Sequence, residues 1–196
     1  MVMYKNQTPK KYVPDSCIGR RCYENSAYFD MLKIKVGDLS AAAITFTSVS
    51  EYEINKRTEY GFDKMHSQWE SSVNSEIPVE QITYDVHQLG IWLCDNVEGL
   101  HLPDNQILAY AMITGSVLIT CDKGLETAAI SVGQSVINPD RPIITQTITK
   151  TDFSSIAQNK VYQIKNKIQT PVQTIKKIPN QAIRKSVRKI TWSAFQ

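Results

Sequence analysis

Two acidic side chains, Asp104 and Asp122, stand at the two ends of one predicted helix–strand unit. Pro103 and Asp104 open the helix, because the missing N–H of a proline does no harm in a first turn. An apolar run over 117–120 is typical of a strand that is buried on both faces, and Asp122 follows its carboxyl end. Ligands bind at that edge in open α/β sheets. The spacing therefore predicts two carboxylates near one edge of a sheet.

Two further acids occupy similar places earlier in the chain. Asp15 follows a short predicted strand that ends in Tyr-Val-Pro, and Glu53 lies in a helix that follows the apolar run 41–46. Glu51 is the competing candidate for the second place. Residues two apart on a helix diverge by about 200°, so only one of the two glutamates can point toward Asp15. We prefer Glu53. Thr47 or Ser48 is expected to cap this helix, and Glu51 fits a capping box with Ser48.

Each of these acids also has an ordinary structural explanation. An Asp at a helix start is most often an N-cap, an Asp after a strand is often a turn residue, and a Glu in a helix is usually solvated. Four acids at these places can together hold Mg²⁺ or Mn²⁺, which prefer oxygen ligands. Such an ion neutralises a phosphate and lowers the pKa of a bound water. The acids therefore predict a site for phosphodiester chemistry.

This arrangement resembles the PIN domain, a family of metal-dependent nucleases. The resemblance rests on an Asp in the first turn of a helix, an Ile and an Ala on its inner face, and a strand that ends in T-x-D. The sequence supplies Asp104, Ile107, Ala111 and then Leu-Ile-Thr, Cys121 and Asp122. The resemblance also includes the acids after the first two strands, and it covers residues 10–140.

The resemblance implies an endoribonuclease that uses Mg²⁺ or Mn²⁺ to hydrolyse RNA and leaves a 5′-phosphate. Asp15 and Asp122 would be direct or water-mediated ligands, Asp104 would share the metal, and Glu53 would support it or position water. Hydrogen bonds that orient these carboxylates are expected from Ser16, Thr120 and Asn105. Many small family members are toxins of toxin–antitoxin pairs, and members often dimerise. An antitoxin and a second copy of the chain are therefore candidate partners.

The order of predicted elements defines the expected fold. Strands that alternate with helices favour an α/β fold with a parallel sheet. We expect a three-layer α/β/α sandwich over residues 1–148, which is PIN-like, and a basic amphipathic C-terminal extension over 149–196. Cationic residues that flank the expected site are Arg20, Arg21 and Lys123. They are candidates for phosphate contacts, with ordinary surface charge as the equal alternative.

Composition is that of a soluble globular protein, with 42% hydrophobic and 21% charged residues. No 18-residue apolar run and no signal-peptide segment is present in the sequence, so we expect a cytoplasmic protein. The four cysteines form no C-x-x-C pair and are expected to be reduced. Cys17 and Cys121 adjoin the acids and are interpreted as small packing residues.

The charge is divided unevenly along the chain. Residues 1–140 hold 11 Lys and Arg against 18 Asp and Glu, a net charge of −7, whereas residues 141–196 hold 11 against one, a net charge of +10. Apolar residues recur at helical spacing in the basic part, and Pro171 and Pro179 interrupt them. The cations assigned to nucleic-acid contact there are Lys176, Lys177, Arg184, Lys185, Arg188 and Lys189.

Several explanations of this extension and of the whole chain remain open. The extension can bind the RNA backbone, lie on an anionic membrane surface or against a partner, or be disordered when alone. Typical PIN toxins have the length of the body alone, so the extension weakens a toxin assignment. A rival is a non-catalytic PIN-like module that holds RNA or a protein through its extension. A phosphatase is a further rival, but the chain reads Asp15-Ser16-Cys17 where an Asp-x-Asp pair is needed.

Overall fold

The central element of the fold is a small parallel β-sheet. The computed structural model describes residues 10–37, 39, 43–141 and 152–169. The sheet has the order β2-β1-β5-β6, with all neighbours parallel. Its strands are β1 (Lys11–Pro14), β2 (Ala43–Ile44), β5 (Val117–Ile119) and β6 (Val136–Ile137). A second parallel pair joins β3 (Phe46–Thr47) to β4 (Val79–Glu80).

Side chains of the two central strands alternate between two hydrophobic cores. Val13 and Leu118, which are register partners, lie in one core, whereas Tyr12 and Ile119 lie in the other. The first core is covered by α5 (Tyr84–Asn96), α6 (Asp104–Thr114), α7 (Lys123–Ser131) and α8 (Asp152–Gln169). The second is covered by α1 (Ser16–Glu24), α2 (Ser26–Val36) and α4 (Gly61–Val73).

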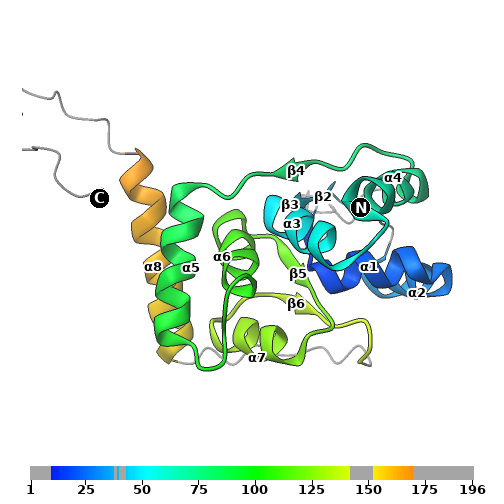
Figure 1. Ribbon diagram of the computed structural model, residues 1–196. Coiled ribbons are helices and arrows are strands. Elements are labelled where there is room, and N and C mark those ends of the chain that lie inside the picture. The colour runs from blue at the N-terminus through cyan, green and yellow to red at the C-terminus, as the bar shows by residue number, and fades with distance from the viewer. Residues whose placement is uncertain (1–9, 38, 40–42, 142–151, 170–196) are drawn as a thin grey trace, which may run out of the picture.

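Helices on both faces of a parallel sheet make three layers (Figure 1). The expected α/β/α sandwich with a central parallel sheet is thus confirmed. Helix α3 (Ser48–Arg57) contributes to both cores, with Val49 in the first and Ile54 in the second. It therefore lies at the boundary of the two helical layers, where a residue can reach the edge of the sheet.

Local polar residues set several boundaries that the periodicity did not predict. The segment 16–36 forms two helices and not one, because the Asn25 side chain accepts the N–H of Ala27 and starts α2. Thr47 caps α3 by accepting the N–H of Ser50 at 3.2 Å. Of the two caps that the sequence allows, Thr47 and not Ser48 therefore starts this helix.

Helix α8 packs on the body of the protein, although it belongs to the predicted extension. Ala157, Val161 and Ile164 are buried in the same core as α5 and α6, and the Phe153 ring stacks on Trp92 with centroids 6.0 Å apart. The boundary at 148/149 stays a prediction. The extension cations from Lys176 onward lie outside the described residues. Among the helices described, none combines the length and apolar character needed to cross a bilayer.

Candidate metal centre

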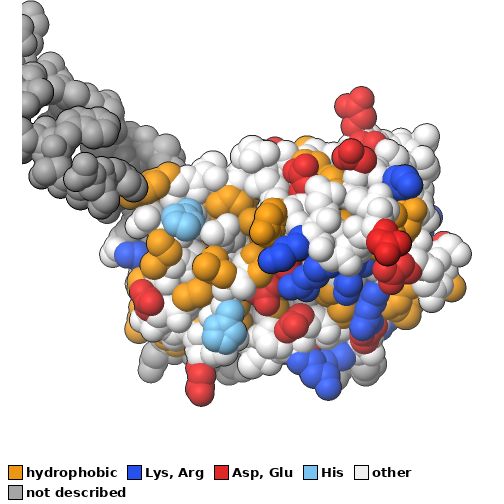
Figure 2. Space-filling view, viewed as in Figure 1, with side chains coloured by type: hydrophobic (Ala, Val, Ile, Leu, Met, Phe, Trp, Pro, Cys, Tyr) orange, Lys and Arg blue, Asp and Glu red, His pale blue; other side chains and the backbone are white. Residues whose placement is uncertain are grey.

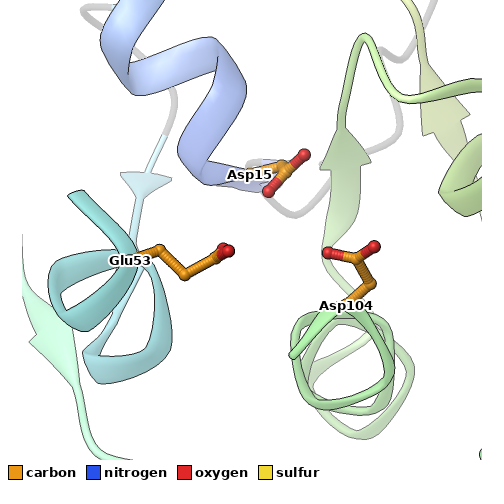
Figure 3. Close-up of side chains that lie close together, drawn as sticks. All are labelled: Asp15, Glu53 and Asp104. Atoms are coloured by element: carbon orange, nitrogen blue, oxygen red, sulfur yellow. The ribbon is translucent and has the colours of Figure 1, made fainter. Parts of the chain in front are cut away.

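Three carboxylates from three different elements converge at one edge of the sheet (Figure 3). One oxygen from each of Asp15, Glu53 and Asp104 lies within 4.8 Å of the others. Asp15 and Glu53 are only 3% and 4% exposed, and Asp104 is half-buried. Together these three residues form the acidic cluster. Burying carboxylates is unfavourable unless cations or hydrogen-bond donors compensate their charge. The groups that compensate these three carboxylates therefore have to be identified.

The backbone brings two of these acids to the same place. Asp15 directly follows β1, and its N–H donates to the carbonyl of Ile119 at the end of β5 at 2.9 Å. Asp15 occupies the N-cap position of α1, but its side chain makes no capping hydrogen bond. Asp104 is the first residue of α6, after Pro103 at the N-cap position. The Asp15 carboxylate therefore points toward its acidic neighbours and does not serve the helix that it starts.

Glu53 is held in the cluster by two donors. Its Oε2 accepts a hydrogen bond from the Ser16 hydroxyl at 2.8 Å, and its Oε1 pairs with Arg57 at 3.1 Å, one turn further along α3. Glu51, two residues earlier, is half-buried and lies outside the acidic cluster. The structure thus brings Glu53, and not Glu51, to Asp15.

Asp122 has a different environment from the other three acids. It is exposed, and its Oδ1 caps α7 by accepting the N–H of Leu125 at 2.9 Å. It is not part of the acidic cluster, yet its charge contributes to the raised pKa of Asp104. Asp122 therefore lies near the same edge and acts as an N-cap, and its assignment as a ligand stays a prediction.

Two of the three predicted orienting residues contact the acids. Thr120, which is fully buried, donates to Asp15 Oδ2 at 3.0 Å and accepts the N–H of Asp122 at 3.0 Å. Ser16 contacts both Glu53 and Asp15 Oδ1. Asn105 points elsewhere, since a Cβ at Gly90 on α5 would lie 3.2 Å from its Nδ2. Its buried Oδ1 has no hydrogen-bond partner within the described part of the chain.

The electrostatics of the cluster appear most clearly at Asp104. Burial raises the pKa of this carboxyl from 3.8 to about 7, and the negative charges of Asp15, Glu53 and Asp122 add to the rise, while Arg57 opposes it. Ionising all of these neighbouring carboxyl groups together is unfavourable in a site shielded from water, because their negative charges repel one another. A bound cation would remove this repulsion, so the site is suited to bind one.

Cationic side chains surround this edge of the molecule. Figure 2 shows Lys and Arg gathered over the region of α3 and α1, with Asp and Glu among them. Arg21 is already paired with Asp140 at 2.6 Å, Arg20 is half-buried, and Lys123 is exposed at the start of α7. Of the flanking cations that the sequence predicts for phosphate contact, Arg21 and Lys123 are both exposed, but Arg21 is already engaged by Asp140.

A contact between two cysteines was missed by the sequence reasoning. Cys17 and Cys121 have their Sγ atoms 2.8 Å apart, and Cys17 Sγ donates to Asp15 Oδ2 at 2.9 Å. Their mutual hydrogen bond raises the pKa of Cys17 and lowers the pKa of Cys121. The available signal was that each cysteine follows the end of a strand, and those two strands are neighbours in the sheet.

The architecture of the sheet can be compared with the resemblance to PIN domains. A parallel sheet carries acids after β1, on α3 and at the start of α6, which are the places that the resemblance specified. No protein-family model matches the sequence, and no curated protein matches it.

Solved structures of bacterial complexes are similar to the chain. One is VapBC2 from Rickettsia felis bound to a DNA fragment of its promoter, at 14% identity and a TM-score of 0.48, covering 65% of this chain and 98% of that one. A toxin–antitoxin complex from Klebsiella pneumoniae matches at 16% identity and a TM-score of 0.45, covering 65% and 97%. FitAcB from Neisseria gonorrhoeae matches at 14% identity and a TM-score of 0.45, covering 67% and 99%.

Proposed function

We propose that the protein is a metal-dependent ribonuclease whose ligands for Mg²⁺ or Mn²⁺ are Asp15, Glu53 and Asp104. The observation that carries this proposal is the convergence of three carboxylates within 4.8 Å, two of them almost fully buried. Asp15 stands at a helix N-cap without serving as its cap, which favours a role beyond local structure. Asp122 is proposed as a further ligand, direct or through water, from its place at the same edge.

The donor set fits a small hard cation. All three groups offer oxygen, which Mg²⁺ and Mn²⁺ prefer over sulfur and nitrogen ligands. Opposite oxygens on one Mg²⁺ lie about 4 Å apart, and the ion commonly retains several waters. A spread of up to 4.8 Å between the carboxylate oxygens is therefore within reach of a small side-chain adjustment. When bound, the ion would neutralise phosphate charge and acidify a bound water.

The surrounding residues hold the carboxylates in place for this task. Thr120 fixes one oxygen of Asp15, and Ser16 bridges Asp15 and Glu53. Asp104, with its pKa of about 7, holds a proton on part of the molecules at neutral pH and must release it when a cation binds. The N-termini of α1 and α6 carry partial positive charge at this edge, which favours an anionic substrate.

RNA is proposed as the substrate on narrower grounds. The sequence resemblance implies it, and the exposed Lys123 beside Asp122 adds a cation for a phosphate. Binding to a phosphate backbone through such cations is expected to weaken as salt rises. A second copy, an antitoxin and a membrane surface remain candidate partners of the extension.

The decisive experiment compares matched variants on a labelled mixed RNA pool, with Mn²⁺ or with EDTA. We expect cleavage only with Mn²⁺, and a loss of at least about a hundredfold in Asp15→Asn and Glu53→Gln. Glu51→Gln, on the same helix as Glu53 but outside the acidic cluster, is the control and should retain activity. Cleavage that persists in EDTA, or that survives both cluster variants, would refute the proposed metal site.

The same experiment separates the enzyme from its main rival. A non-catalytic module would retain RNA on the protein in every lane without producing fragments. Direct Mn²⁺ titration of the wild type and of Asp15→Asn then shows whether the acidic cluster binds a cation at all. Absence of both cleavage and Mn²⁺ binding would shift the conclusion to the binding module.

A further inference from the structure

Two thiols meet beside the acidic cluster, although 104 positions separate them in the sequence. Cys17 lies in the first turn of α1, and Cys121 follows β5. Their Sγ atoms are 2.8 Å apart, and the N–H of Cys121 points at Cys17 Sγ at 3.4 Å. Both side chains are half-buried, so each keeps part of its surface in contact with solvent.

The sheet fixes this proximity. Pro14 and Ile119 are register partners on the neighbouring strands β1 and β5, and each cysteine follows its strand by a few residues. The Thr120 hydroxyl ties the end of β5 to Asp15. A disulfide needs its sulfur atoms at about 2.05 Å, so the pair must approach by less than 1 Å. Side-chain rotation supplies shifts of this size.

We propose that Cys17 and Cys121 form a reversible disulfide when the protein meets a low-molecular-weight disulfide such as oxidised glutathione. One cysteine attacks the reagent, breaks its S–S bond and releases one reagent thiol. The second cysteine attacks the resulting mixed disulfide and releases the other. Two electrons pass from the cysteine sulfurs to the reagent, and the two thiol hydrogens end on the two released reagent thiols.

The crosslink would reach the acidic cluster through Asp15. In the reduced protein, Cys17 Sγ donates to Asp15 Oδ2, which also accepts from Thr120. The disulfide has no S–H, so this oxygen loses one of its two donors when the bond forms. The state of the thiols is thereby transmitted to a carboxylate of the proposed metal site. Formation of the disulfide itself does not depend on nuclease activity.

The test treats the full-length protein with glutathione buffers of increasing oxidised fraction, followed by alkylation of free thiols and peptide mass mapping. We expect two of the four thiols to disappear together and a peptide joining Cys17 to Cys121, reversed by reduction. Cys94→Ser, on α5, which covers the other core, should form the same crosslink. Cys17→Ser and Cys121→Ser should not form it.

Thermal unfolding supplies an independent measurement. A bond that closes a loop of this length should raise the melting temperature by roughly 5–15 °C in the oxidised wild type. The rise should be absent in Cys17→Ser treated in the same way. A stable mixed disulfide with glutathione on either cysteine, or disulfide-linked dimers in place of the internal crosslink, would overturn the proposal.

Discussion

Replacing Asp104 by Asn should stabilise the metal-free protein at pH 8. The Asp104 pKa is about 7 in the folded protein, against 3.8 for the unperturbed group. Between pH 4 and 7 the folded state therefore keeps a proton that the unfolded chain has released. The stability present below pH 4 is lost as pH rises to 7. Asn cannot ionise, so the advantage of the variant grows over this window and is constant above it.

The size of this effect follows from the same two pKa values. A rise from 3.8 to about 7 corresponds to roughly 4 kcal/mol at 1.36 kcal/mol for each pH unit. Asp104 is only half-buried, so solvent screening reduces the value to about 2 kcal/mol. For a chain of this length, such a gain corresponds to a melting temperature about 4–8 °C higher.

Urea unfolding in EDTA, followed by tryptophan fluorescence at several pH values between 5 and 8, measures the difference. The exposed Asp95→Asn, on α5, is the control and should match the wild type throughout. Adding Mn²⁺ at a hundred times its Kd should stabilise the wild type by about 2.7 kcal/mol. The wild type should then be more stable than Asp104→Asn. The reasoning fails if Asp104→Asn is less stable than the wild type at pH 8 in EDTA, or if the difference is the same at pH 5.

The other predictions concern metal affinity, the fourth acid and the C-terminal helix. Mn²⁺ affinity, measured by titration calorimetry, should fall up to about tenfold for each pH unit below 7, because the ion must displace the proton held in the acidic cluster. An Mn²⁺ affinity that does not change with pH would contradict the raised pKa of Asp104. Asp122→Ala should lower the free energy of unfolding in urea by about 1 kcal/mol, because α7 loses its N-cap. Asp122→Asn keeps the cap and should be within a few tenths of a kcal/mol of the wild type. Equal losses in the two variants would contradict the capping role. Deleting 152–196 should cost several kcal/mol in unfolding free energy, because it removes the buried face of α8, and deleting 170–196 alone should weaken salt-sensitive RNA binding. A folded, fully stable 1–151 fragment would refute the packing of α8.

Much of the acidic edge follows from rules that act over a few residues. The start of α6 at Asp104, the strand β5 and the following Asp122 are set by proline, periodicity and β-branched residues within one continuous stretch. The parallel sheet then places Asp15 beside them, because the ends of β1 and β5 are neighbours. Local patterns and one topological rule were enough to predict that Asp15 and Asp104 meet and that Asp122 lies near the same edge.

Features that depend on distant contacts were beyond sequence reasoning. The apolar spacing of Val161 and Ile164 was visible, but nothing local showed that α8 packs on α5 and α6. The approach of Cys17 to Cys121 depends on which strands pair, so each thiol alone looked like packing. Asn105 was placed at the site by its neighbour Asp104, but one residue turns a helix by about 100°, and its side chain points at α5 instead.

The two cores on opposite faces of the sheet have a consequence for how the protein opens. Each core has its own helices, and among the described elements only β1, β5, β6 and α3 contribute to both. Such a layout favours two cooperative units that unfold separately, with the amides of β1 and β5 exchanging last. Asp15 and Asp104 start helices of opposite layers, and Glu53 lies on the helix between them. A cation bound by all three carboxylates would therefore link the two units, so that they unfold together in one cooperative transition.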